Sequence, residues 1–289
     1  MELTWGQRTW VMGIINLTAD SFSGDGLAPE GRDAEAVVRA AVEQGRRFVA
    51  EGAQILDVGA ESSRPAQFYG EHPPIAAEEE QALVVPVVEA LAGELGDRAL
   101  VSVDTTKGSV ARAALTAGAR IVNDVWAGRR DPDTLSAAAE AGAHLVLMHN
   151  REVADYPNGV TSEIVTFLQL AIDDALAAGV PRERLIVDPG IGFGKTPEHS
   201  IEVLHRAAEL KQRLGGLPML IGTSRKRVLG ELLGGAAPDQ RLEGSLATLA
   251  LAIAAGADIV RVHDVAASVR VARVADGIVR WRAGVEAGR

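Results

Sequence analysis

The chain has 289 residues, a formal net charge of −10 at pH 7 and no cysteine. The missing cysteine excludes disulfides, thiolate catalysis and Cys-ligated metals, and the acidic balance disfavours nucleic acid as a partner. Every apolar run is broken by Gly, Pro or charge before about 18 residues, and the N-terminus lacks a basic-then-apolar signal pattern, so we expect no membrane partner and a cytoplasmic protein.

Short apolar runs recur along the chain, and several of them follow an Ala-rich stretch that ends in Gly. The clearest copies are AEGAQILDVG (50–59), TAGARIVNDV (116–125), EAGAHLVLMH (140–149) and AAGADIVRVH (254–263), with a weaker AAGVPRERLIVD (177–188). These copies place Gly52, Gly118, Gly142, Gly179 and Gly256 just past a helix end, where a left-handed backbone is needed. With the runs that lack this lead-in, eight strands are predicted near 11–16, 54–59, 100–104, 119–123, 144–148, 184–188, 218–222 and 258–262.

Stretches long enough for helices separate these runs, for example 35–50 and 78–95. Continuously apolar strands that alternate with helices are typical of a parallel sheet. Eight such units in this length favour a closed barrel over an open doubly wound sheet. The sequence therefore predicts an α/β fold of the (β/α)8 TIM-barrel class, with residues 1–289 as a single domain.

Polar residues are expected at the carboxyl ends of the strands, where this fold builds its active sites. Four of them stand within otherwise apolar strand ends: Asp57, Asp104, Asn123 and Asp188. A buried acid or amide is costly unless it is paired. We favour a polar ligand near the barrel axis as their partner, and mutual structural pairing is the alternative.

The chemistry of these groups suits a flat aminopyrimidinone ring, such as a pterin or a purine. A carboxylate accepts hydrogen bonds from the ring N–H and the exocyclic NH2, whereas an amide both donates and accepts. Arg64, Lys226, Arg261 and His263 could supply the local basic patch that a phosphorylated group needs. The alternative is a surface ion pair for Arg64 or Arg261 and an exposed helix end for Lys226.

The stretch DPGIGFGK (188–195) is rich in glycine but has neither of the common nucleotide-loop spacings. We interpret it as a wall that lets Phe193 cover a planar substrate. The histidines show no zinc spacing; His144 is expected to be structural, and His199 and His205 to be solvated on a helix. A hard cation held by oxygens, such as Mg2+, is compatible with the sequence.

Taken together, the motifs resemble those of the bacterial dihydropteroate synthases, a family of pterin-binding enzymes, over about residues 10–280. The matching segments occur in the family's order, and the whole set is far more specific than any one of them. They are MGIINLTADSFSGDG (12–26), DVGAESSRP (57–65), VSVDTTK (101–107), IVNDV (121–125), VLMH (146–149), DPGIGFGK (188–195), GTSRKRVLG (222–230) and RVHDV (261–265). The resemblance implies a TIM barrel that condenses a pterin pyrophosphate with p-aminobenzoate.

The resemblance also implies a role for individual residues. The pterin ring would be held by Asp104, Asn123, Asp188 and Lys226, with Met148 and Arg261 beside it. The pyrophosphate would be bound by Asn16, Arg64, Arg261 and His263, with Asn16 as the protein ligand of Mg2+. The p-aminobenzoate would be surrounded by Ser63, Arg64, Pro65, Phe193 and Ser224. Catalysis would depend on Asn16, Arg64, Lys226, Arg261 and His263, which hold the partners in line and neutralise the leaving group.

In addition, the resemblance implies that Asp57 and Glu61 order the second loop, and that the chain forms a homodimer through late helices such as 241–255. Small departures fall in the first two loops, where Ala19 replaces a usual Pro and Ser63 a usual Thr. These departures bear on the affinity for p-aminobenzoate and for sulfonamides, whereas the pterin residues match the family.

Two other functions would use the same barrel. A pterin-dependent methyltransferase domain that serves a corrinoid would share the acid and amide groups, but it binds no pyrophosphate and would not need the cations at 224–226, Arg261 and His263. A non-catalytic pterin-binding paralogue is disfavoured because Asn16, Arg64 and the other basic residues are intact. We therefore predict a dihydropteroate synthase acting on small-molecule substrates.

Overall fold

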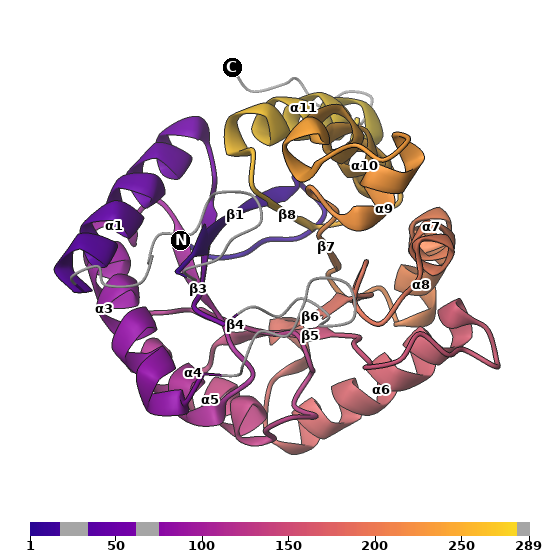
Figure 1. Cartoon of the computed structure of the whole chain (residues 1–289). Helices are drawn as coiled ribbons and strands as arrows, with labels where there is room; N and C mark the ends of the chain where they lie inside the picture. Colours follow the sequence, from indigo (N-terminus) through magenta and orange to yellow (C-terminus); the bar gives the residue numbers. More distant parts are fainter. Residues whose placement is uncertain (18–33, 62–74, 282–289) are drawn as a thin grey trace.

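The strands of the protein form a ring that is surrounded by helices (Figure 1). A computed structural model of the chain describes residues 1–17, 34–61 and 75–281. All strand pairs are parallel, in the order β6-β5-β4-β3-β2-β1-β8-β7. The two ends of this sheet meet at an isolated bridge between Val187 and Met219, where the Val187 amide donates to the Pro218 carbonyl at 2.9 Å. The predicted (β/α)8 barrel is therefore confirmed, with its closure thinnest between β6 and β7.

The strands coincide with the eight apolar runs predicted from the sequence. They are β1 (Trp10–Asn16), β2 (Ile55–Gly59), β3 (Leu100–Asp104), β4 (Ile121–Asp124), β5 (His144–Met148), β6 (Leu185–Asp188), β7 (Leu220–Ile221) and β8 (Ile259–Val262). The last two are shorter than predicted, and β7 keeps only two residues. Because both faces of the sheet are covered, the strand residues are almost all buried.

Helices cover the outside of the ring and confirm the stretches predicted at 35–50 and 78–95. They are α1 (Ala34–Glu51), α3 (Ala77–Leu95), α4 (Gly108–Thr116), α5 (Asp133–Ala141), α6 (Val160–Ala177), α7 (Pro197–His205), α8 (Ala207–Arg213), α9 (Arg227–Leu232), α10 (Leu242–Ala254) and α11 (Val265–Val279). Short 3-10 turns span Arg182–Arg184 and Pro238–Gln240. In the part of the chain that the structure describes, none of these helices could span a bilayer.

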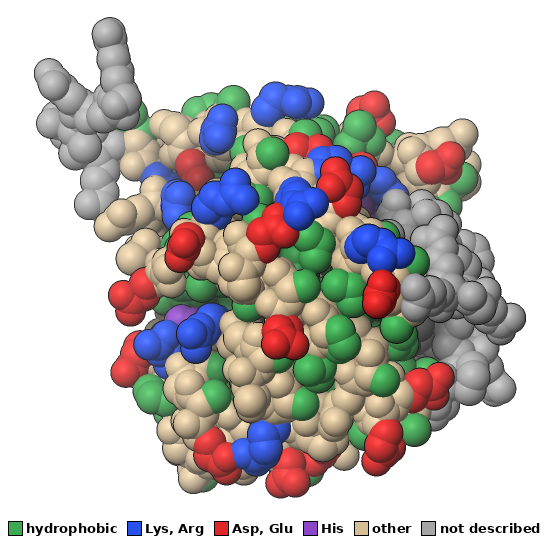
Figure 2. All heavy atoms as spheres, turned by 90° about the vertical axis from the view of Figure 1, so that its left-hand side faces the viewer, with side chains coloured by type: hydrophobic (Ala, Val, Ile, Leu, Met, Phe, Trp, Pro, Cys, Tyr) green, Lys and Arg blue, Asp and Glu red, His purple; other side chains and the backbone are tan. Residues whose placement is uncertain are grey.

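Charged side chains of both signs are intermixed on the outer face shown in Figure 2. Neighbouring helices use such side chains as links: Arg46 of α1 donates to both carboxylate oxygens of Glu94 in α3. Exposed pairs of this kind stabilise a fold only slightly, so the packing beneath them carries the stability.

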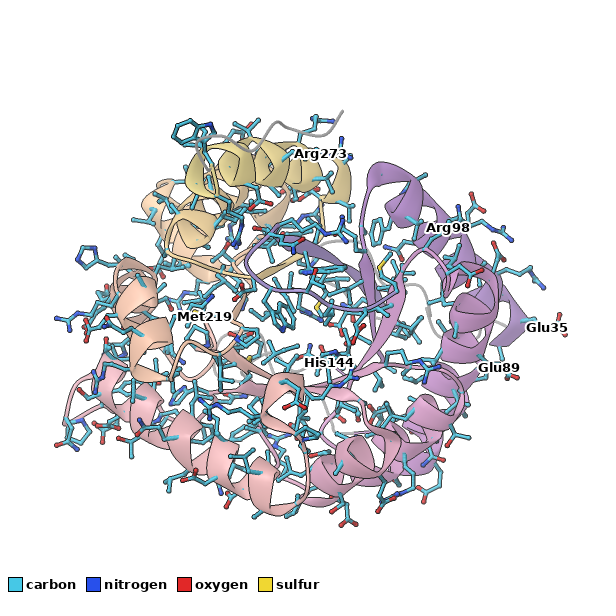
Figure 3. All side chains as sticks on the ribbon, turned by 180° about the vertical axis from the view of Figure 1, so that it is seen from behind. Glu35, Glu89, Arg98, His144, Met219 and Arg273 are labelled. Atoms are coloured by element: carbon cyan, nitrogen blue, oxygen red, sulfur yellow. The ribbon has the colours of Figure 1, made fainter. Side chains whose placement is uncertain are left out.

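Two apolar clusters fill the barrel and its surroundings. The larger lies between the strands and the helices, and the smaller, which includes Trp10, Met12 and Ile55, fills the barrel interior towards its amino end. His144 begins β5 at this end, where Arg184 lies 3.0 Å away and Trp5 packs edge-on (His144 is labelled in Figure 3). Burial lowers the pKa of His144 to about 4, which fits the structural role predicted for it. A filled amino end leaves the carboxyl end as the place where a ligand can enter.

The glycines of the repeated helix–Gly–strand unit adopt the backbone that the sequence predicts. Gly52, Gly118, Gly142, Gly179 and Gly256 have φ of 106°, 116°, 60°, 95° and 95°. An L-residue is strained there, so glycine ends each helix and turns the chain back into the barrel.

Two of these glycines give a test of how tightly the helices pack. A Cβ at Gly118 would lie 2.6 Å from the Cβ of Ala92 in α3, whereas a Cβ at Gly142 meets no atom within 4 Å. We expect Gly118→Ala to lower the free energy of unfolding by about 2–4 kcal/mol, from overpacking and backbone strain together. Gly142→Ala serves as the control and should cost only about 1 kcal/mol, from strain alone. Urea unfolding followed by circular dichroism measures both, and equal losses would contradict the packing argument.

Candidate active site

The strand register places polar residues in one row at the carboxyl end of the barrel. Asn16 pairs with Gly59, Gly59 with Asp104, and Asp104 with Asn123, so the row crosses β1 to β4. Asn123 in turn pairs with Val146 of β5, so Asp188, which ends β6 and pairs with Met148, lies two residues beyond this row. Gly59 is the small member, because a Cβ there would lie 3.1 Å from the Cβ of Asp104. Parallel pairing therefore brings together groups that lie far apart in the sequence.

Asn123, Met148 and Asp188 line a cavity of about 40 Å³, which we call the mouth cavity. It contains eight of the residues predicted for the site: Asn123, Met148, Asp188, Phe193, Ser224, Lys226, Arg261 and His263. Asp104 lies next to it and touches the Arg261 guanidinium. The cavity is small because side chains from opposite strands meet across it.

Arg261 of β8 lies at the centre of this arrangement. Its Nε donates to Asp57 Oδ2 at 2.6 Å and its second terminal nitrogen to Asp104 Oδ2 at 2.8 Å. Asn123 Nδ2 donates to the same Asp57 oxygen at 3.1 Å. The alternative of a surface ion pair for Arg261 is therefore wrong, since its partners are buried. Asp57 Oδ1 is also buried and bonds to no residue that the structure describes.

Burial raises the pKa of two acids at this end of the barrel, Asp104 and Asp188. It raises the pKa of Asp104 to about 7, although the charge of Arg261 opposes this shift. Burial also raises the pKa of Asp188, with Lys226 as the main opposing charge. Burial works against the charge of Arg261, but Asp57 and Asp104 outweigh it and raise the pKa of the guanidinium. Burial thus opposes the charged forms of Asp104 and Asp188, and the neighbouring cations oppose burial.

Lys226 and Phe193 form one wall of the mouth cavity. Lys226 caps the start of α9, as the helix-end alternative supposed, but its side chain turns inwards. The Lys226 ammonium donates to the Ile191 carbonyl and lies 4.6 Å from the centre of the Phe193 ring. Asp188 Oδ1 accepts from the Gly190 amide at 2.7 Å, which fixes the acid at the base of the same wall.

Arg261 of β8 and His263, which follows β8 directly, both line the mouth cavity as their spacing predicts. Ser224 Oγ lies 3.0 Å from His263 Nδ1 and 3.2 Å from the His263 amide. Arg225, which has a φ of 59°, is held by Asp264 at 2.7 Å. These contacts join the end of β7 to the end of β8.

A second cavity, which we call the side cavity, lies between α1 and α11 and measures about 370 Å³. It shares Ile14 and His263 with the mouth cavity. Its lining includes three arginines, Arg47, Arg225 and Arg270, two acids, Glu51 and Asp264, and the first turn of α11. Glu51 pairs with Arg47 and Asp264 with Arg225, so the positive charge next to His263 comes from Arg270 and the helix N-terminus.

Asn16 is the residue predicted to bind Mg2+. It ends β1, is half-buried, and follows two residues after Ile14, which lines both cavities, so the two side chains share a face. The described residues contain no cluster of three His, Asp or Glu side chains that could hold a metal. One amide oxygen fits Mg2+ only where phosphate oxygens and water complete its shell.

Three of the predicted residues, Ser63, Arg64 and Pro65, lie outside the described part of the chain. Asp57 was expected to order the second loop; it lies instead inside the barrel beside Arg261. Glu61 pairs with Lys107 at the carboxyl end of the strands.

A buried pair at this end of the barrel, Lys195 and His149, is not apparent from the sequence. Lys195 Nζ lies 2.8 Å from His149 Nδ1, and both side chains are almost fully buried. A lysine at the end of a glycine-rich stretch carries no signal for burial, since lysine is usually exposed. The solvated role expected for His199 is wrong, because His199 caps α7 with Thr196 and packs on Tyr156, whereas His205 is exposed.

Comparison with known proteins agrees with this geometry. The family model described as pterin binding enzyme matches residues 12–263. A dihydropteroate synthase of Bacillus subtilis is 40% identical over 286 residues, which cover 99% of this chain and 94% of the relative.

Solved structures are similar as well. A dihydropteroate synthase from Clostridium difficile, determined in the presence of pteroic acid, superposes with a TM-score of 0.88 at 40% identity and covers 97% of this chain and 100% of its own. The Xanthomonas albilineans enzyme with 4-aminobenzoic acid gives a TM-score of 0.82 at 41% identity, covering 93% and 92%. On these matches, which span nearly all of the barrel, the chain belongs to the pterin-binding enzyme family, in its dihydropteroate synthase branch.

Proposed function

We propose that this chain uses its mouth cavity to join 6-hydroxymethyl-7,8-dihydropterin pyrophosphate to p-aminobenzoate, giving 7,8-dihydropteroate and pyrophosphate. One observation carries the assignment of the site: Asn123, Asp188, Lys226 and Arg261 line one cavity, and Asp104 binds the Arg261 guanidinium beside it. Acids and an amide on one side suit the N–H and carbonyl edge of a pterin, and cations on the other suit its diphosphate.

The pterin ring would take the place that Arg261 now fills. A cavity of about 40 Å³ cannot hold a bicyclic ring, and the Arg261 guanidinium is the group between the acids. We propose that the pterin N–H groups replace those of Arg261 at Asp104, and that Arg261 then lies over the ring with Met148 on the other side. Asp188, Asn123 and Lys226 would bind the rest of the ring edge.

The leaving group would lie towards the side cavity. His263 lines both cavities, Arg261 lines the mouth cavity, and Asn16 lies two residues after Ile14, which lines both. Together with Arg64 they would neutralise the pyrophosphate as its bond to the pterin methylene carbon breaks. A bound Mg2+, held by Asn16 Oδ1 and the phosphate oxygens, would add positive charge at the departing oxygens.

The second substrate would approach from the Phe193 wall. The p-aminobenzoate would lie among Phe193, Ser224, Ser63, Arg64 and Pro65. Loss of pyrophosphate leaves a resonance-stabilised cation at the methylene carbon, the amine nitrogen attacks it, and the nitrogen then releases a proton. No protein nucleophile is needed, so the chain's work is to position and to neutralise.

We also propose a cytoplasmic homodimer that forms through α10 and α11. Large apolar side chains are exposed on these neighbouring helices: Leu251 on α10, and Val274 and Ile278 on α11. Exposed apolar groups that cluster on one face are typical of protein contacts. The methyltransferase alternative is disfavoured, because it gives no reason for Lys226, Arg261 and His263 to converge on one cavity.

The activity itself can be tested directly. The purified chain is incubated with the pterin pyrophosphate, p-aminobenzoate and Mg2+, and dihydropteroate is followed by liquid chromatography. We expect product and pyrophosphate in equal amounts, and no product when Mg2+ is removed with a chelator. Binding of the pterin without any product would rule out the synthase and leave the non-catalytic paralogue.

The variant Arg261→Ala tests neutralisation of the diphosphate separately from binding of the pterin ring. We expect turnover to fall about 100- to 1000-fold, because the variant loses a cation at the departing diphosphate. The Kd of a pterin without the diphosphate, measured by fluorescence, should change less than about tenfold, because Asp104, Asn123 and Asp188 remain. Arg261→Lys is the control that keeps the charge and should retain part of the turnover. Near-normal turnover in the alanine variant would remove Arg261 from the mechanism.

The raised pKa of Asp104 predicts a slope of stability with pH. The folded chain keeps a proton on Asp104 up to a pKa of about 7, while the unfolded chain releases it near its ordinary value of about 4. The contribution of this bound proton to the free energy of unfolding is therefore fully present below about pH 4 and is lost as the pH rises towards 7. From about pH 5 to about pH 7 the wild type should lose stability relative to Asp104→Asn, by at most about 1.4 kcal/mol per pH unit in urea unfolding. An opposite slope would mean that Arg261 keeps the acid ionised.

A further inference from the structure

Lys195 is a buried amine that the proposed reaction does not use. Its side chain is 2% exposed, and its Nζ lies 2.8 Å from His149 Nδ1 and 3.1 Å from the Phe193 carbonyl oxygen. Both of these partners are uncharged acceptors. Burial lowers the pKa of His149 to about 2, so this ring is neutral and its Nδ1 can accept from the lysine.

This contact joins two segments at the carboxyl end of the barrel. The segment 189–196 between β6 and α7 lies directly against the segment 149–159 between β5 and α6. A Cβ at Gly190 would lie 1.9 Å from the His149 carbonyl oxygen, and one at Gly194 2.2 Å from that of Arg151. Tyr156 also donates its hydroxyl to the Gly194 carbonyl at 2.7 Å. Two glycines therefore let the backbones touch, and the Lys195–His149 contact is the buried polar bond between them.

The same segment forms the Phe193 wall of the mouth cavity. Lys195 binds the carbonyl of Phe193, while Lys226 binds the carbonyl of Ile191 and lies over the Phe193 ring. Two lysines thus hold this segment, one from behind and one from inside the site. Lys226 would be drawn towards the pterin when substrate binds, and Lys195 is then the lysine that still fixes Phe193.

Stability alone gives no reason for an amine at this place. Burial lowers the pKa of Lys195 well below its ordinary value, with Asp188 only partly opposing, so the charged form is disfavoured. An apolar side chain of similar length would avoid this cost of removing an amine from water. What an apolar residue cannot do is donate to His149 and Phe193 at once, and so define where the segment lies.

We propose that Lys195 is a positioning residue that acts through the Phe193 carbonyl and fixes Phe193 as the wall against which p-aminobenzoate binds. This inference rests on the proposed function. Removal of Lys195 should loosen the segment 189–196 and weaken the use of the second substrate. It should leave the pterin largely unaffected, because Asp104 and Asn123 stand on β3 and β4, outside this segment.

The test compares Lys195→Met with the wild type in the full chain. We expect the KM for p-aminobenzoate to rise about tenfold while the Kd of the pterin changes less than about threefold. Hydrogen exchange followed by mass spectrometry should show amides of 189–196 exchanging at least about tenfold faster. The double variant with Phe193→Ala should have the same KM as Phe193→Ala alone, because both changes act through one ring.

Two further variants make the test independent of folding problems. Lys211→Met is the matched control: Lys211 is a partly buried lysine that binds the Gly256 carbonyl and Asp258 at 2.7 Å and 2.6 Å, before the start of β8. It should lower the melting temperature without changing the exchange of 189–196 or the KM. His149→Leu breaks the same contact from the other side and should reproduce the effects of Lys195→Met. It therefore keeps the test decisive if Lys195→Met folds poorly.

The outcomes separate this inference from the proposed function. An active wild type with unchanged p-aminobenzoate KM and unchanged exchange in both Lys195→Met and His149→Leu would overturn the role of Lys195. A wild type that makes no dihydropteroate would overturn the proposed function, and the exchange of 189–196 would then still show whether Lys195 fixes the segment. A fall in melting temperature with both readouts unchanged would reduce Lys195 to a stabilising residue.

Discussion

The ion pairs between Arg261 and two buried acids, Asp57 and Asp104, are the interaction on which the carboxyl end of this barrel depends. The three residues come from β8, β2 and β3, and the paired residues are 204 and 157 positions apart in the sequence. Two carboxylates and one amide meet where all three are buried, and an unpaired buried charge is costly. Arg261 supplies the opposing charge, and the barrel supplies the register that brings the acids within its reach.

In the proposed binding mode, Asp104 exchanges the Arg261 guanidinium for the pterin ring. The donors of a guanidinium and the N–H edge of an aminopyrimidinone satisfy the same carboxylate oxygens. The pterin would thus pair with Asp104 in place of Arg261, while Asn123 still donates to Asp57. Burial raises the pKa of Asp104 to about 7 while the charge of Arg261 opposes the rise, so the ionised form of this acid depends on that partner.

The loops at the carboxyl end add two lysines and a wall to the acids that the strands carry. Asp188 stands between two lysines, Lys226 on the cavity side and Lys195 behind, and both oppose the rise in its pKa that burial causes. The loop after β6 is pressed against the loop after β5 by glycines at φ of 70° and 53°, Gly190 and Gly194. The site is thus built as layers, with rigid strands below and one bonded wall beside them.

The sequence by itself determined the barrel and much of the site's chemistry. Eight apolar runs, helix-length stretches and glycines past helix ends are local patterns, and each follows from burial or backbone sterics in its own neighbourhood. Asp104, Asn123 and Asp188 could be selected because a polar residue within an apolar strand end is visible without coordinates. The ordered motifs then indicated a family, and the family model and the solved relatives agree with it.

Only the tertiary structure decided which groups meet. Parallel register set Asn16, Gly59, Asp104 and Asn123 in one row, and ring closure brought Arg261 from β8 to Asp57 on β2. The burial of Lys195 against His149 was equally invisible, because nothing near a lysine in the chain tells whether water reaches it. Partners separated by scores of residues are chosen by the closure of the barrel, and a linear pattern does not contain that geometry.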